Sequence, residues 1–196
     1  MSATPARPRS DRFAGVQLVL SLLAAIWVLE LVDIALDHRL DQYGIEPREL
    51  DGLVGVVAAP FLHADFGHLI ANTIPFVALG IIIGFQGVAR VLWVTGIVML
   101  VSGLGTWLVA PDDSLHIGAS GIVFGYATYL LARGIFNRDV IEIAIGLGVA
   151  AIWGTALLGG LVPQDGVSWQ GHFFGAVGGV LAARTLRRDR TPSGAS

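Results

Sequence analysis

The chain contains no cysteine and no lysine, and only 14% of its 196 residues are charged. Without cysteine it cannot form a disulfide, an iron–sulfur cluster or a thiolate metal site. Soluble globular chains carry about 25% charged residues. Hydrophobic residues make up 54% of this chain, and so large an excess of apolar surface indicates a protein dissolved in lipid.

Long apolar stretches recur along the whole sequence. A helix needs about 20 mostly apolar residues to cross a bilayer. The sequence therefore predicts an all-α, polytopic membrane protein with a bundle of six transmembrane helices. The expected spans are 15–36, 66–85, 91–110, 119–132, 140–161 and 169–186. They form one domain, 13–186, between an N-terminal tail, 1–12, and a C-terminal tail, 187–196; the polar connector 37–54 is expected to hold short helical pieces.

The arginines predict the orientation of this bundle, because all twelve basic residues are arginine. With six spans both termini share one side. Ten arginines fall there, namely Arg7, Arg9, Arg12, Arg90, Arg133, Arg138, Arg184, Arg187, Arg188 and Arg190. Only Arg39 and Arg48 lie opposite. The positive-inside rule places both termini in the cytoplasm, and the absence of an evident organelle-targeting segment suggests a prokaryotic plasma membrane.

Polar side chains inside the spans are candidate functional residues, because each is costly in lipid unless it is paired. His68 and Asn72 are four residues apart and project from one helix face. Taken alone, such a pair is typical of a hydrogen bond between helices. Glu30, Asp33 and Glu142 lie near helix ends, where we expect snorkelling or water to solvate them, and they receive no catalytic part.

A serine and a histidine begin two of the expected spans. Ser120 lies in a Gly-Ala-Ser-Gly sequence that starts at Gly118, and a lone serine at a helix start is typically an N-cap. His172 begins the last span. Glycines such as Gly121 and Gly175 allow two helices to approach closely. Close approach would bring the imidazole within hydrogen-bond distance of the hydroxyl, which general-base activation of a nucleophile requires.

A third member of a triad is not evident, because neither of these two spans contains a carboxylate and the nearby acids, Asp65, Asp112, Asp113 and Asp165, lie in loops or at span ends. We therefore predict a dyad of Ser120 and His172. Phe124 lies one turn beyond the serine and is placed to press on the imidazole. Acyl transfer also needs donors for the developing oxyanion, and His68, Asn72 and the serine's own backbone N–H are the candidates.

Three motifs in order resemble those of the rhomboid intramembrane proteases. Residues 63–72, HADFGHLIAN, resemble the HxxxxHxxxN signature, Gly118 to Gly121 resemble the GxSG nucleophile motif, and 171–179, GHFFGAVGG, resemble the histidine-bearing final helix. The resemblance covers about 43–186. It implies the bacterial six-helix form, in which a water-filled cavity opens to the extracytoplasmic side.

The resemblance also implies roles and partners. Ser120 corresponds to the nucleophile, His172 to the general base, and His68 and Asn72 to the oxyanion-stabilising pair, while His63 resembles a structural histidine. The implied activity is hydrolysis of peptide bonds in or near transmembrane segments of membrane-protein substrates, within membrane lipid. No cofactor, metal or nucleic acid is expected.

Two departures from the family and three alternatives accompany this hypothesis. Loop 37–62 shows no Trp–Arg pair of the kind that anchors it in some relatives, and Phe124 stands where some members carry tyrosine. The main alternative is a catalytically silent rhomboid-like protein that binds membrane helices. A metal or haem site built from the five histidines lacks the HExxH spacing of zinc enzymes. A transporter lacks an evident inverted repeat.

Overall fold

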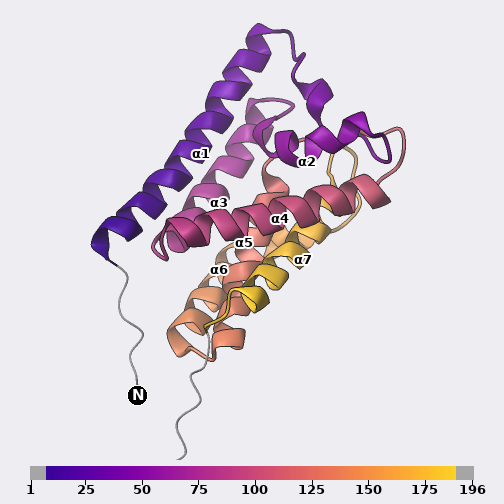
Figure 1. Ribbon diagram of the computed structural model, residues 1–196. Coiled ribbons are helices and arrows are strands. Elements are labelled where there is room, and N and C mark those ends of the chain that lie inside the picture. The colour runs from indigo at the N-terminus through magenta and orange to yellow at the C-terminus, as the bar shows by residue number, and fades with distance from the viewer. Residues whose placement is uncertain (1–7, 189–196) are drawn as a thin grey trace, which may run out of the picture.

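The computed structural model describes residues 8–188, which form a set of packed helices (Figure 1). This described part contains no β-strand, only two isolated bridges, so the predicted all-α fold is confirmed. The helices are α1 (Arg9–Ala35), α2 (Gly55–Ala58), α3 (Phe66–Gly84), α4 (Val88–Val109), α5 (Ser120–Asn137), α6 (Val140–Gly160) and α7 (Trp169–Thr185). Three short 3-10 helices, η1 (Asp41–Tyr43), η2 (Asp51–Val54) and η3 (Ala59–Phe61), lie between α1 and α3. Residues 1–7 and 189–196 of the expected tails lie outside the described residues.

Six of these helices lie where the sequence predicted spans. Four of them, α1, α3, α4 and α6, are long and apolar enough to cross a membrane by length and composition alone. The other two, α5 and α7, have 18 and 17 residues. Both pack extensively on several neighbours. Helices that are covered by protein need less apolar surface than helices that face lipid, which accounts for their weaker signal.

Two helix boundaries differ clearly from the prediction. The fourth span was expected to end at residue 132, but α5 continues to Asn137. It does so because Arg133 is not left in lipid and forms an ion pair with Glu142 of α6. Helix α1 begins at Arg9 rather than near residue 15. Asp11 lies in its first turn, where a carboxylate stabilises the helix, and accepts a hydrogen bond from the backbone N–H of Val88.

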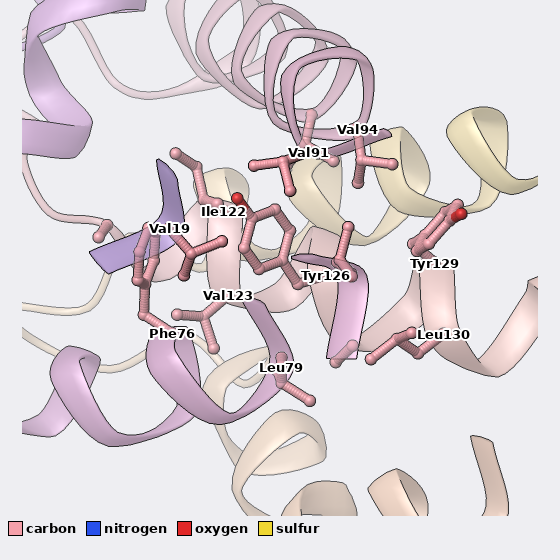
Figure 2. Close-up of a cluster of buried hydrophobic side chains, with 14 of the residues drawn as sticks. Val19, Phe76, Leu79, Val91, Val94, Ile122, Val123, Tyr126, Tyr129 and Leu130 are labelled. Atoms are coloured by element: carbon pink, nitrogen blue, oxygen red, sulfur yellow. The ribbon is translucent and has the colours of Figure 1, made fainter. Parts of the chain in front are cut away.

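The hydrophobic core is centred on α5. Figure 2 shows Tyr126 between side chains from α1, α3 and α4, including Val19, Phe76 and Val91. Tyr126 is fully buried, and its hydroxyl lies 2.6 Å from the Thr95 hydroxyl of α4. A buried tyrosine normally finds such a partner for its O–H. Helix α5 is therefore held by contacts on several sides. These contacts also fix the position of Ser120, which is the first residue of the helix.

The contact between α5 and α7 is made backbone to backbone. A Cβ atom on Gly175 would collide with the backbone of Gly121, and one on Gly179 would collide with the backbone of Gly125. Small residues permit this close approach. Because both helices begin at the same end of the contact, their first residues lie side by side.

The loop between α1 and α3 is attached to the C-terminal end of α4. Arg48 forms an ion pair with Asp112, and its backbone N–H donates to the Trp107 carbonyl at 3.1 Å. The Trp107 indole N–H donates in turn to the Glu49 carbonyl at 2.8 Å. A tryptophan of α4 and an arginine of the loop thus hold this loop, although the loop itself contains no Trp–Arg pair.

The expectation that water or snorkelling solvates Glu30, Asp33 and Glu142 is wrong. Their exposed fractions are 0%, 1% and 6%. Glu142 is buried because Arg133 pairs with it and Asn137 donates to it at 2.7 Å. The other two are covered where the chain folds back over the end of α1.

Candidate active site

The backbone before Ser120 is held in place by two hydrogen bonds. The Gly118 N–H donates to the Ala59 carbonyl at 2.8 Å, and the Ala119 N–H donates to His63 Nε2 at 3.3 Å. Gly118 has a φ of +118°, in the region that favours glycine. A Cβ atom there would also meet the His68 ring. Glycine at this position therefore satisfies both a backbone and a space requirement.

His172 lies between two oxygen atoms. Its Nε2 is 2.8 Å from Ser120 Oγ, and its Nδ1 is 2.7 Å from the carbonyl oxygen of Gly160, the last residue of α6. A carbonyl only accepts, so Nδ1 carries the hydrogen and donates it. In the neutral imidazole this leaves Nε2 free to accept from the serine hydroxyl.

Phe124 fixes the plane of the imidazole. Its ring stacks on His172 with the centroids 4.1 Å apart and the planes only 4° from parallel. Gly160 lies at the edge of this stack, where a Cβ atom would meet both rings. The contact between Phe124 and the imidazole that the sequence indicated is present.

His68 and Asn72 line the same cleft as the serine and the histidine. This cleft has a volume of about 850 Å³ and is also bordered by the loops before α5 and α7. Asn72 Nδ2 donates to the His68 carbonyl at 3.1 Å. A primary amide has two hydrogens, so the second can donate into the cleft. Of the expected supporting residues, Gly121 and Gly175 lie at the helix contact behind it.

His63 supports the site from behind. Burial, aided by the nearby His68, lowers the pKa of His63 to about 4, so its ring is neutral at pH 7. The neutral ring leaves Nε2 to accept from the Ala119 N–H. The two histidine rings meet edge to face with their centroids 5.0 Å apart. This placement agrees with the structural part that the resemblance gave to His63.

Two contributors were missed by the sequence analysis. The first is the Gly160 carbonyl, whose only advance signal is that the last four carbonyls of any helix lack helical partners. The second is His116, whose Nδ1 is 2.7 Å from the Ser168 hydroxyl and whose Nε2 is 2.8 Å from the Ser114 hydroxyl. Burial lowers the pKa of His116. Its ring ties the loop before α5 to Ser168, the N-cap of α7.

Comparison with known proteins agrees with the resemblance in the motifs. A family model described as the Rhomboid domain matches residues 51–189. An uncharacterized protein of Mycobacterium tuberculosis is 45% identical over 193 residues, which cover 93% of this chain and 79% of that protein. YdcA of Bacillus subtilis, whose name proposes a rhomboid protease, is 29% identical over 121 residues, 61% of this chain and 60% of the relative.

Proposed function

This chain is an integral membrane protein of the rhomboid family, and from that premise we propose that it is an intramembrane serine endopeptidase. Ser120 is the nucleophile and His172 the general base. The observation that carries the proposal is the 2.8 Å contact between His172 Nε2 and Ser120 Oγ, with the other ring nitrogen held by the Gly160 carbonyl.

The first half of the reaction forms an acyl-enzyme. Ser120 Oγ attacks the scissile carbonyl carbon as its proton passes to His172 Nε2. The imidazolium then carries two hydrogens, and the Gly160 carbonyl accepts the one on Nδ1, which stabilises the added charge. When the tetrahedral intermediate collapses, Nε2 returns its proton to the leaving amine.

The second half releases the acid product. A water molecule attacks the acyl carbon while His172 Nε2 takes its proton, and collapse of the second tetrahedral intermediate returns a proton to Ser120 Oγ. Water has a route to the bond because the cleft is lined by polar groups such as Gln164 and Gln170 as well as by the reacting side chains.

Charge on the carbonyl oxygen needs donors that are already oriented. We assign this part to His68, to the second amide hydrogen of Asn72 and to the Ser120 backbone N–H. Each donor of this kind is worth about 2.7–4 kcal/mol of transition-state stabilisation where it has been measured. The placement of His68 and Asn72 in the same cleft as the nucleophile supports the assignment.

The proposed substrates are membrane proteins, cut near the outer ends of their transmembrane segments. The arginine distribution supports an orientation with both termini in the cytoplasm and the cleft open to the extracytoplasmic side. A substrate helix hides its carbonyls in backbone hydrogen bonds and must unwind before serine can attack. Small or helix-weakening residues near the scissile bond are therefore favoured. The mycobacterial relative supports a prokaryotic plasma membrane.

The proposal is tested with purified protein in liposomes that contain a generic transmembrane substrate. Wild type is expected to cleave it and to react with a fluorophosphonate at Ser120. Ser120→Ala should do neither, and His172→Ala should lose both activities. Ser21→Ala is the matched control, since Ser21 is exposed on α1, and it should behave as wild type. A folded wild type that neither cleaves nor labels would replace this proposal with that of a catalytically silent protein that binds membrane helices.

A further inference from the structure

A second group of ionisable side chains lies at the end of α1, outside the catalytic cleft. Glu30 and Asp33 are one turn apart on this helix, and both are almost completely buried. After the helix ends, the chain turns through Asp37 and His38, which both have left-handed backbone angles. Asp41 follows as the first residue of η1. The turn brings Asp33, which precedes the helix end, close to His38 and Asp41, which follow it.

Three side chains of this group converge on one point. His38 Nδ1 lies 3.6 Å from Asp33 Oδ2 and 3.8 Å from Asp41 Oδ2. One nitrogen and two carboxylate oxygens thus lie within 4.8 Å of one another. The other oxygen of Asp33 accepts from the Leu40 N–H at 2.6 Å, which fixes the carboxylate with Oδ2 directed toward the histidine.

The independent sign of a missing partner is a set of buried oxygen atoms. Asp33 Oδ2, Asp41 Oδ1 and both carboxylate oxygens of Glu30 are buried without a hydrogen-bond partner among the described residues. Buried carboxylates are ordinarily paired or coordinate a metal. The basic side chain that faces both Asp33 and Asp41 among the described residues is the half-exposed His38, which cannot by itself neutralise two carboxylates.

We propose that Asp33, His38 and Asp41 bind a divalent cation of the zinc class. Bonds of about 2.0–2.1 Å in a tetrahedral zinc site place neighbouring donor atoms about 3.3–3.4 Å apart. The separations of 3.6 and 3.8 Å from His38 Nδ1 to the two aspartates are close to that value. Imidazole nitrogen suits zinc better than calcium or magnesium, which take oxygen ligands.

Such an ion would attach the end of α1 to the loop that supports the active site. Asp41 begins η1, and Ile45, four residues later, exchanges two backbone hydrogen bonds with His116. His116 lies directly before the Gly118–Gly121 segment. No metal was expected from the sequence, because the histidines lack the spacing of standard zinc ligands. Asp33, His38 and Asp41 come together only through the turn at the end of α1.

The experiment uses the full chain in detergent after treatment with a chelator, with zinc chloride as the only added ligand. We expect one zinc ion per chain by elemental analysis and a rise in thermal midpoint with zinc concentration, because a ligand of the folded state stabilises it. His38→Gln and Asp41→Asn should each weaken zinc binding by more than the roughly 10–100-fold that loss of an outer-shell partner costs. Both residues are less buried than Asp33, so these variants are expected to fold.

Two controls separate this site from the catalytic cleft. Asp37→Asn changes a neighbouring acid of the same turn, and His172→Ala removes a cleft histidine; both should bind zinc as wild type does. The proposal is overturned if wild type binds no zinc, a result that would leave a proton shared by Asp33 and Asp41. It is also overturned if binding survives His38→Gln and is lost in His172→Ala. Calcium binding as tight as zinc binding would overturn the assigned class of ion.

Discussion

Glycines play opposite parts in α7 and α6. In α7, Gly175 and Gly179 meet the backbone of α5 so closely that neither has room for a Cβ atom. In α6, Gly148 and Gly154 have only open space where a Cβ would be. Large side chains of α6 such as Leu147 are also mostly exposed. The α5–α7 contact is therefore a close, fixed interface, whereas much of α6 faces the surroundings of the bundle.

The difference indicates where the proposed chemistry needs rigidity. Ser120 and His172 lie near the starts of the two helices that pack backbone to backbone. Helix α6 contributes only the Gly160 carbonyl, which its last turn supplies whatever its outward side chains are. Substitutions in the α5–α7 contact should therefore affect cleavage severely, while substitutions on the outer face of α6 should be tolerated.

The largest expected effect comes from Gly175→Val. The added side chain collides with the Gly121 backbone, so α7 must move away from α5 and His172 with it. We expect loss of detectable cleavage and a lower thermal midpoint, since overpacking costs about 1–3 kcal/mol or more. Gly154→Val is the matched control and should keep the cleavage activity and the thermal midpoint of wild type. Equal effects of the two variants on cleavage would remove the distinction between the helices.

Glu142→Ala tests the polar attachment of the first turn of α6 to α5. It leaves Arg133, whose side chain is only 13% exposed, without this partner, and breaking a buried ion pair costs about 3–5 kcal/mol. We expect a marked fall in the denaturation midpoint in detergent. Arg188→Ala is the control, because Arg188 is half exposed where it pairs with Glu142 and such pairs contribute at most about 1 kcal/mol. Comparable losses in both variants would contradict this account of the attachment.

Most of the helical layout was predictable because lipid imposes a simple rule on sequence. Apolar runs of the required length marked α1, α3, α4 and α6 directly. The predicted helix boundaries were wrong where contacts with other helices override that rule. Arg133 looked like the end of a span, and only its pairing with Glu142 of the next helix explains why α5 continues.

The candidate site was predictable to the extent that side chains define it. Ser120, His172 and Phe124 were identified from residue type and position, and the structure brings the three together. The Gly160 carbonyl was not identified, because a backbone acceptor leaves no residue signature. The grouping of Asp33, His38 and Asp41 was missed because it depends on the left-handed turn after α1, which apolar periodicity does not encode.

A smaller effect on stability is expected from the protonation of His63, which lies behind Ser120, as the pH falls. Its pKa is about 4 in the folded chain and about 6.5 when unperturbed. The unfolded chain therefore binds the proton first as pH falls. The neutral His63 therefore contributes roughly 3 kcal/mol to the free energy of unfolding above about pH 6.5. This contribution is lost as the pH falls from about 6.5 to about 4. His63→Leu should show a smaller fall in thermal midpoint from pH 7 to pH 5 than wild type; an unchanged fall would assign that pH dependence to other groups.

The smallest expected effect tests whether the fixed interface acts through the imidazole plane. Phe124 contacts His172 by stacking alone, and aromatic pairs contribute about 0.5–1.5 kcal/mol beyond burial. Phe124→Leu keeps most of the packing volume and loses the stack, so we expect kcat to fall about 2- to 10-fold with little change in KM. Phe124→Tyr should restore kcat. Phe173→Leu is the control, since Phe173 is a half-exposed residue of α7, and it should match wild type. If Phe124→Leu raised KM and left kcat unchanged, Phe124 would act on substrate binding instead of on the orientation of His172.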